Sequence, residues 1–331
     1  MAVTLKDVAE LAGVSRSAVS RTFTKGASVS EKTRQKVMKA ADALGYSPNA
    51  LASSLTTGRT KMIGLISNNF HNPVFLEVFD MFTRGLHERD LRPLLVNLTD
   101  ETDPEASIRM LRQYSVDGVI VASSTLPPAF AKSFRDAGIP VVHSFGRHTE
   151  APDVDVLGID NIAAGRMAAR ILIEHGYTDL GFLGGPARAT SSIDREKGFL
   201  LECAAHKGVT TRVSFANAYS FEAGRQEMLA LLNAPLAQAY FCGDDVLSIG
   251  AISALQTAGL SVPEDVGILG LNDIAMARWE NIDLTTIRNP FSQIIAASIE
   301  QVTALIEDPS ITPKAHLFEC SVVERSTLKA R

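Results

Sequence analysis

The sequence predicts a small α-helical headpiece of the helix-turn-helix type, followed by a two-lobed α/β core with parallel sheets. The chain begins with two short amphipathic stretches that are joined by a tight turn, as in a helix-turn-helix. From about residue 61, short apolar runs alternate with helical patterns, which is typical of parallel sheets covered on both faces. About 270 residues of this pattern exceed one common domain size, so two lobes are expected.

The first helix is predicted to begin after Thr4, because Asp7 follows three residues later as in a capping box. Gly13 stands where the chain must turn sharply, in a left-handed conformation that costs glycine little. The apolar face of this helix is expected to consist of Val8, Leu11 and Ala12.

The second helix carries the side chains that point to a nucleic acid. Ser15 is its expected cap, and Ala18, Val19 and Phe23 form its apolar face. The other face carries Arg16, Ser17, Ser20 and Arg21. These residue types hydrogen-bond to base edges and phosphates, and a recognition helix presents its first turns to the major groove. The alternative interpretation is an ordinary three-helix cap with a charged surface.

A third helix is expected between its cap, Ser30, and its stop at Gly45, with Val37, Ala41 and Leu44 facing the core. Residues 47–58 follow, from a proline-containing start to Gly58. This segment is too short for an isolated stable helix, which needs roughly 12–15 residues. It is either a flexible linker or a hinge that becomes helical only on DNA.

In the hinge interpretation two residues act on the DNA directly. Ala52 is small enough to let the helix approach a groove, and Leu55 is an apolar wedge that can enter a base step and kink the duplex.

The charge of the chain is divided unevenly. Residues 1–60 contain nine Lys or Arg and four Asp or Glu, a net charge of +5, whereas the whole chain carries −5. The remaining residues therefore carry −10. A basic head on an acidic body predicts a polyanionic partner for the head alone.

The chain resembles the LacI/GalR family of transcription regulators, named after the lac and galactose repressors. The resemblance rests on headpiece motifs and on core motifs that continue to the end of the chain. The headpiece motifs are residues 3–15, 19–21, 29–34, 44–49 and 51–55, and the core motifs are residues 63–66, 117–120, 158–161, 184–186, 284–287 and 323–327.

The resemblance implies a domain plan. It consists of a headpiece over residues 1–46, a hinge over 47–58 and a periplasmic-binding-protein-like core for effector binding and dimerisation over 59–331. The N-lobe would take about 61–159 and 290–318, and the C-lobe about 160–287 and 320–331, with crossovers near residues 159, 288 and 319.

The strands expected from apolar runs are Met62–Ser67, Leu91–Leu98, Gly118–Ala122, Ile139–His143, Leu180–Gly184, Ala239–Cys242, Val266–Leu271 and Leu317–Val323, and Ser292–Glu307 is an expected helix.

The resemblance also implies a mechanism, repression of transcription by a homodimer on a pseudo-palindromic operator. Arg16, Ser17 and Arg21 would read bases. The residues expected to fix the register on the DNA backbone are Thr4, Ser15, Thr33 and Asn49, and Ser20 shares the exposed face of the recognition helix. A small-molecule effector, a sugar or sugar derivative, would close the lobes and change operator affinity.

The effector is expected between the lobes, at the carboxyl ends of the strands. Carboxylates, amides and arginine bind hydroxyls there, and aromatic rings cover apolar faces. The residues expected to bind it are Phe75, Arg147, Ser191, Arg195, Tyr219, Asp244 and Asn272. Members of the family that bind sugars or purines often have Asp where this chain has Asn272, so either Asp273 acts instead or the amide changes selectivity. A second departure is Ser-Phe-Gly-Arg at residues 144–147, where many members carry an acidic residue or an Asn-Arg pair.

Other classes of protein are disfavoured. The chain starts with a polar helix rather than a signal peptide, no apolar run approaches ~18 residues, and three widely spaced cysteines fit reduced thiols in the cytoplasm. No cofactor and no metal site are expected, because the histidines are scattered and no nucleotide-binding glycine loop follows a strand. Asp244-Asp245 suggests magnesium or, with more support, a helix cap or hydroxyl acceptor. The chain is not expected to be an enzyme, and the alternatives are a fusion to a sugar-processing enzyme or a non-secreted solute-binding protein.

Overall fold

The structure is a computed structural model that describes residues 3–24, 26–49, 54, 58–68, 70–98 and 103–330. The chain divides into two compact units, residues 1–61 and residues 62–331, which are described separately. Most of the predicted hinge, including Ala52 and Leu55, lies outside the described residues. No helix in the described part of the chain is long and apolar enough to cross a membrane.

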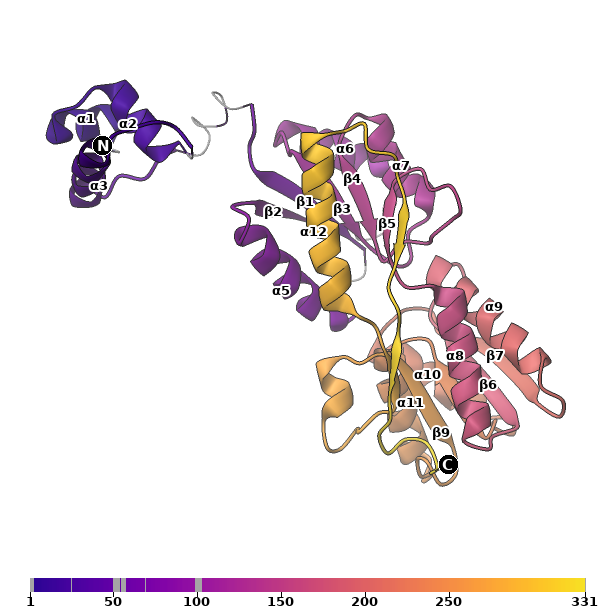
Figure 1. Cartoon of the computed structure of the whole chain (residues 1–331). Coiled ribbons are helices and arrows are strands. Elements are labelled where there is room, and N and C mark those ends of the chain that lie inside the picture. The colour runs from indigo at the N-terminus through magenta and orange to yellow at the C-terminus, as the bar shows by residue number, and fades with distance from the viewer. Residues whose placement is uncertain are drawn as a thin grey trace. The chain divides into compact units, whose positions relative to one another are not determined.

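The first unit contains the helices α1 (Leu5–Ala12), α2 (Arg16–Phe23) and α3 (Glu31–Leu44), labelled in Figure 1. They enclose a small core around Val8, Val19 and Val37, which are fully buried. Leu11 was expected in this core and is 57% exposed, so that expectation is wrong. The inward stripe of α1 is instead Leu5, Val8, Ala9 and Ala12, and it leaves Leu11 on the outer face.

The predicted helix ends are confirmed. The backbone N–H and the hydroxyl of Thr4 donate to Asp7 Oδ2 at 2.7 and 2.8 Å, and Ser15 Oγ accepts from Ala18 N at 3.2 Å. Ser30 caps α3 in the same way, since its Oγ accepts from Thr33 N at 3.2 Å. Gly13 ends α1 with a φ of 66°, in the left-handed conformation that makes the tight turn possible.

The second unit contains two sheets, each the centre of one lobe. The sheet of the N-lobe is parallel throughout and has the order β11-β5-β4-β3-β1-β2. Its strands are β1 (Met62–Ser67), β2 (Arg92–Asn97), β3 (Gly118–Ala122), β4 (Val141–Ser144), β5 (Asp155–Gly158) and β11 (Ala315–Leu317). Helices α5 (Val74–His87) and α12 (Phe291–Glu307) share a core with one face, and α6 (Pro104–Gln113) and α7 (Pro128–Asp136) with the other.

The sheet of the C-lobe has the order β12-β10-β9-β8-β6-β7, and β12 alone runs antiparallel to its neighbour. Its strands are β6 (Asp179–Gly184), β7 (Thr210–Phe215), β8 (Ala239–Cys242), β9 (Gly267–Asn272), β10 (Thr286–Arg288) and β12 (Ser321–Val323). The helices pack in pairs, α8 (Asn161–Glu174) with α9 (Thr190–Ala204) and α10 (Phe221–Leu231) with α11 (Asp245–Thr257). A short 3-10 helix, η1 (Ala275–Arg278), follows β9.

The α8–α9 pair is close enough to require glycine at the contact. A Cβ atom at Gly165 of α8 would lie 2.1 Å from the carbonyl oxygen of Arg195 in α9. A Cβ at Gly198 of α9 would lie 2.0 Å from the carbonyl oxygen of Ile162. These contacts fix α9, and with it Arg195, against the first helix of the C-lobe.

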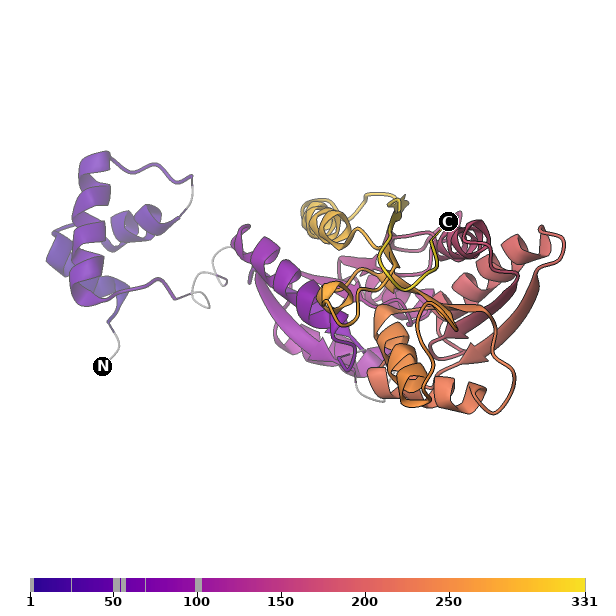
Figure 2. The ribbon, with the colours of Figure 1, turned by 90° about the horizontal axis from the view of Figure 1, so that it is seen from below.

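The chain passes between the two sheets three times, after β5, after β10 and between β11 and β12. Figure 1 shows the last crossing in yellow, running from one lobe to the other, and Figure 2 shows the same ribbon from below. The single strand expected over Leu317–Val323 is therefore wrong, because Leu317 ends β11 in one sheet and Ser321–Val323 form β12 in the other. The predicted strands Gly118–Ala122 and Ala239–Cys242 are confirmed with the same bounds.

Candidate nucleic-acid interface and ligand cavity

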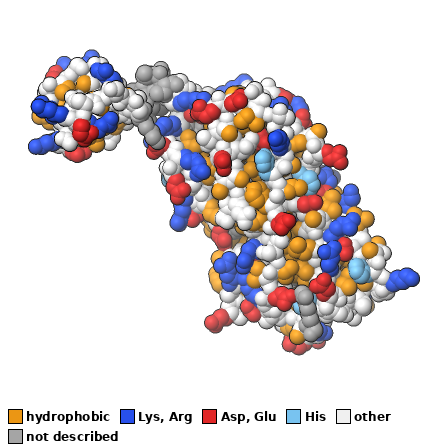
Figure 3. Space-filling view, viewed as in Figure 1, with side chains coloured by type: hydrophobic (Ala, Val, Ile, Leu, Met, Phe, Trp, Pro, Cys, Tyr) orange, Lys and Arg blue, Asp and Glu red, His pale blue; other side chains and the backbone are white. Residues whose placement is uncertain are grey.

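The exposed face of α2 carries the polar residues that the sequence assigns to DNA. Arg16, Ser17, Ser20 and Arg21 are all exposed, whereas Val19 and Thr22 on the opposite face are buried. Ser17 Oγ lies 2.9 Å from Ser15 Oγ, and Arg21 Nε donates to the carbonyl oxygen of Ser17 at 3.3 Å. Figure 3 shows Lys and Arg side chains over the visible face of this unit. The face combines hydroxyls and guanidinium groups at the start of a helix, which suits base and phosphate contacts.

The other residues expected at the DNA lie at helix ends or beyond them. Thr4 and Ser15 precede α1 and α2 and take part in their caps. Thr33 Oγ1 accepts from Ser30 Oγ at 2.8 Å in the first turn of α3, and Asn49 is exposed.

In the second unit, a cavity lies between the two lobes. It is lined by Asn72, Val74, Phe75, Val78, Ser124, Phe145, Ile159, Asn161, Arg195, Tyr219, Asp244, Asn272, Asn289 and Phe291. Both lobes and two of the crossing segments therefore contribute to its wall. Five of the residues expected to bind an effector lie in this wall: Phe75, Arg195, Tyr219, Asp244 and Asn272.

Asp244 is the centre of a hydrogen-bond network across the cavity. Its Oδ2 accepts from Asn72 Nδ2 of the N-lobe and from Asn272 Nδ2 of the C-lobe, both at 2.9 Å. Its Oδ1 accepts from Val246 N at 2.9 Å and caps α11. Burial raises the pKa of Asp244 to about 6, although the Val246 N–H, the Arg195 charge and the two amides oppose this rise.

Asn289 extends this network along the second crossing segment. Its Nδ2 donates to Asn272 Oδ1 at 3.2 Å. Its Oδ1 is buried and has no hydrogen-bond donor among the described residues. Because Asn289 lines the cavity, this oxygen is an acceptor that a bound hydroxyl or N–H can satisfy.

Arg195 is the cation of the cavity and is only 4% exposed. Its Nε donates to Asn161 Oδ1 at 2.8 Å, and its Nη1 donates to the carbonyl oxygen of Gly243 at 2.5 Å. Among the lining residues Arg195 and Asp244 carry opposite charges, so the wall is close to neutral. Three phenylalanines add apolar surface, and the rings of Phe145 and Phe291 meet edge to face at 5.7 Å.

Two of the residues expected to bind the effector, Ser191 and Arg147, are not among the lining residues. Ser191 Oγ lies 3.0 Å from the hydroxyl of Tyr219, so it supports a lining residue instead of lining the cavity itself. Arg147 Nη2 donates to Asp194 Oδ1 at 2.5 Å and is likewise absent from the wall. The role of both residues as effector contacts stays a prediction, and in this structure each side chain is engaged by another residue.

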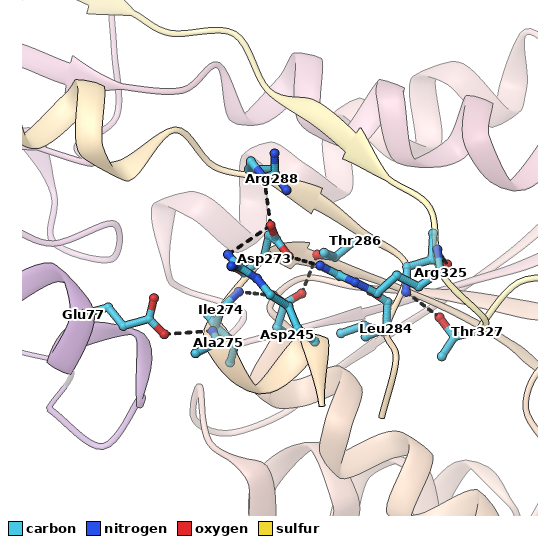
Figure 4. A network of polar contacts seen from close by, with 12 residues as sticks. Glu77, Asp245, Asp273, Ile274, Ala275, Leu284, Thr286, Arg288, Arg325 and Thr327 are labelled. Atoms are coloured by element: carbon cyan, nitrogen blue, oxygen red, sulfur yellow. Dashed lines mark hydrogen bonds and ion pairs between the residues drawn. The ribbon is translucent and has the colours of Figure 1, made fainter. Parts of the chain in front are cut away.

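Asp273, the alternative carboxylate for the Asn272 position, is not among the lining residues. Figure 4 shows why: Arg288 Nε and Arg325 Nη2 donate to it at 2.8 and 2.6 Å. Burial would raise the pKa of Asp273, but the hydrogen bonds and charges of these arginines outweigh it and lower the pKa. Asp273 therefore ties the end of β9 to the end of β10 and to the segment that follows β12, and the cavity is left with the neutral Asn272.

The carboxylate of Asp245 is also occupied by hydrogen bonds within the C-lobe. It accepts from Thr286 Oγ1 at 2.6 Å and from Ile274 N at 2.9 Å, and burial raises its pKa to about 7. With Asp244 as a helix cap, the pair fits the cap interpretation better than magnesium. Within the described ranges, no three His, Cys, Asp or Glu side chains gather to hold a metal ion.

The residue-based prediction of the cavity missed nine lining residues, all of them neutral. They are Asn72, Val74, Val78, Ser124, Phe145, Ile159, Asn161, Asn289 and Phe291. Most of them follow strands or open helices, so their position in the chain was a signal. Their residue types alone are too common in loops to indicate a ligand.

Comparison with known proteins agrees with this architecture. A model of the bacterial regulatory proteins of the lacI family matches residues 4–49, and a model of periplasmic binding protein-like domains matches residues 169–328. The HTH-type transcriptional repressor PurR of Pectobacterium carotovorum is 31% identical over 341 residues, covering 98% of this chain and 96% of that protein. The PurR of Proteus mirabilis is 35% identical over 295 residues, covering 87% of this chain and 85% of its own length.

Solved structures share the fold. The lac repressor dimer bound to operator and the anti-inducer ONPF has a TM-score of 0.88 at 23% identity, over the full length of both chains. The complex of the transcriptional regulator CelR with cellobiose has a TM-score of 0.73 at 27% identity, covering 98% of this chain and 100% of CelR. At 23% identity, the likeness to the lac repressor shows a shared fold alone. Both likenesses extend over the headpiece and the two-lobed core of this chain.

Proposed function

Since this chain belongs to the LacI family and is a DNA-binding transcription regulator under the control of a small-molecule effector, we propose that it is a repressor whose effector is a small carbohydrate. The observation that carries this proposal is the network around Asp244. It places carboxylate and amide oxygens, amide N–H groups and a guanidinium around the cavity between the lobes. These groups suit a ligand whose hydroxyls both donate and accept.

The charge of the wall favours a neutral ligand. Arg195 is balanced by Asp244, and the other polar groups of the wall are amides and hydroxyls. A phosphate or carboxylate would need further cations or N–H groups to replace its water. The three phenylalanines supply apolar surface for the carbon face of a sugar ring. The CelR complex, a structure of similar fold, contains cellobiose and supports a carbohydrate in this chain as well.

We further propose that the repressor acts as a homodimer on a pseudo-palindromic operator. Leu76 on α5 and Leu95 on the edge strand β2 are 77% and 51% exposed, which is unusual for large apolar residues in the N-lobe. A second copy of the chain would cover them. The lac repressor neighbour is described as a dimer on operator, which supports this arrangement.

On the operator, Arg16, Ser17 and Arg21 would contact bases, and Leu55 would enter a central step of the minor groove. Thr4, Ser15, Thr33 and Asn49 would contact the DNA backbone around them. A regulator that binds chromosomal DNA works in the cytoplasm of a bacterium. The relatives are named as repressors, which supports a regulatory role over a sugar-processing one.

A ligand screen tests the proposal. Thermal unfolding of the full chain is followed with a panel of neutral mono- and disaccharides, sugar phosphates and purines. A neutral sugar should raise the unfolding temperature of the parent chain and leave Arg195→Ala unchanged. A phosphate or a purine as the only ligand that stabilises the chain would contradict the carbohydrate proposal.

A further inference from the structure

The first turns of α9 hold the C-lobe against the N-lobe beside the cavity. The carbonyl oxygen of Ser124, which follows β3, accepts from Ser191 N at 3.2 Å and from Thr190 Oγ1 at 3.0 Å. One turn later, Asp194 Oδ1 accepts from Arg147 Nη2 at 2.5 Å. Arg147 follows β4 of the N-lobe, so this ion pair joins the two lobes.

The ion pair is asymmetric in exposure. The side chain of Asp194 is 8% exposed and that of Arg147 is 37% exposed. A carboxylate as buried as Asp194 needs a charged or hydrogen-bonding partner, and its guanidinium partner comes from the opposite lobe. Opening the lobes would therefore separate a buried carboxylate from its cation.

Asp194 is next to the cation of the cavity. Arg195 follows it directly in α9, and its guanidinium is held by Asn161 and Gly243 of the C-lobe. The glycine contacts at Gly165 and Gly198 fix α9 against α8. Arg147 thus binds a rigid helix that carries Arg195 into the cavity, although Arg147 itself is not a lining residue.

We propose that Arg147 is a positioning residue whose ion pair with Asp194 latches the two lobes over the cavity and sets ligand affinity without contacting the ligand. The proposal rests on the proposed function, in which the cavity binds the effector. It predicts that loss of the latch weakens every ligand by the same factor, because the latch stabilises the closed lobes and not one ligand.

A second contact between the lobes, a hydrogen bond, can be used to measure lobe opening. Ala275 N, at the start of η1 in the C-lobe, donates to Glu77 Oε1 of α5 in the N-lobe at 2.9 Å (Figure 4). It involves neither Arg147 nor Asp194. The rate of hydrogen exchange at the Ala275 amide therefore measures lobe opening, and no ligand is needed for the measurement.

The test compares Arg147→Asp, Asp194→Arg and the double variant in the full chain by hydrogen-exchange mass spectrometry of the peptide that contains Ala275. Each single variant should speed exchange about three- to ten-fold. The expected change is modest because Arg147 is partly exposed and water screens its charge. The double variant, which restores opposite charges, should regain most of the protection. Arg147→Gln gives a milder loss of the latch if a reversed charge hinders folding.

The matched control is Arg166→Asp. Arg166 pairs with Glu202 of α9 at 3.6 Å, but both residues belong to the C-lobe, so exchange at Ala275 should not change. Unchanged exchange in Arg147→Asp and Arg147→Gln, or failure of the double variant to restore protection, would overturn the latch.

A second experiment measures the binding affinity of the sugars that stabilise the parent chain. Arg147→Gln should lower the affinity for each of them by one common factor, whereas a change in their order of preference would overturn the proposal. If no sugar binds, the carbohydrate proposal fails, but the exchange experiment still decides whether the latch exists.

Discussion

Asn72 Nδ2 in the N-lobe donates a hydrogen bond of 2.9 Å to Asp244 Oδ2 in the C-lobe. The same carboxylate oxygen accepts from Asn272, which the second crossing segment contacts through Asn289. A single acceptor thus joins both lobes and, through two amides, a segment that connects them. A ligand that competes for Asp244 changes the contacts that hold the lobes together, which is the physical basis for control from the cavity.

The protonation of Asp244 should make the free energy of unfolding depend on pH. Its folded pKa of about 6 lies above the ordinary value of 3.8, so the folded chain retains a proton that the unfolded chain has lost. The contribution of Asp244 to the free energy of unfolding therefore falls as pH rises from about 4 to about 6, and stays constant above that range. Asp244→Asn removes this titration, and should gain up to about 3 kcal/mol relative to the parent over the same range.

Urea unfolding of both proteins between pH 4 and pH 8 measures the difference, with the exposed Asp136→Asn as the control. A difference between parent and Asp244→Asn that does not vary with pH would mean that Asp244 titrates normally in the folded chain.

Arg195→Ala should weaken binding in the cavity. Loss of a charged hydrogen bond in a buried site weakens a ligand by about 1.5–3 kcal/mol, or roughly 10- to 150-fold. Isothermal titration with a sugar from the screen measures the loss, and Arg170→Ala, on the surface of α8, is the control. Normal affinity in Arg195→Ala would remove this residue from the binding site.

Arg21→Ala tests how the recognition helix reads DNA. A base contact should cost ~1–3 kcal/mol and relax one base preference in each half-site. Binding to a library of operator variants gives both quantities, and Lys39→Ala, an exposed cation on α3, is the comparison. An equal loss of affinity for all sequences would identify Arg21 as a phosphate contact.

Leu55→Ala tests the hinge, which lies outside the described residues. A wedge that opens a base step bends the duplex, and smooth bending of a site costs of order 1–6 kcal/mol. The variant should bend operator DNA less and bind it more weakly while the oligomeric state stays the same. Operator fragments with the site at different positions report bending in gel mobility, and unaltered bending would contradict the wedge.

The sequence predicted those features that depend on neighbouring residues. Helix caps such as Thr4 with Asp7, and buried strands such as Gly118–Ala122, depend on local spacing and apolar runs, and both are confirmed. The edge strand β7 escaped prediction because Thr210–Arg212 are exposed and lack an apolar run. The division of the last strand between two sheets depends on where the lobes lie, which no local pattern specifies.

The residues of the cavity show the same limit of prediction from local sequence. Arg195 and Asn272 were placed by family motifs, and the structure puts both in the wall. Arg147 has the right residue type and follows a strand end, yet Asp194, 47 residues later, takes its guanidinium. Asn289 has no distinctive sequence context, and only its unsatisfied buried oxygen marks it. Pairings between distant segments are therefore what the sequence leaves undetermined.

The central claim is that a ligand in the cavity between the lobes controls DNA binding by the headpiece. Fluorescence anisotropy of a labelled operator, titrated with the parent chain and with Arg195→Ala, each with and without a saturating sugar from the screen, tests it most directly. The sugar should change the operator affinity of the parent by about 1–3 kcal/mol, up to roughly 150-fold, and leave that of Arg195→Ala unchanged. Equal operator affinity of the parent with and without a sugar that demonstrably binds would contradict the claim.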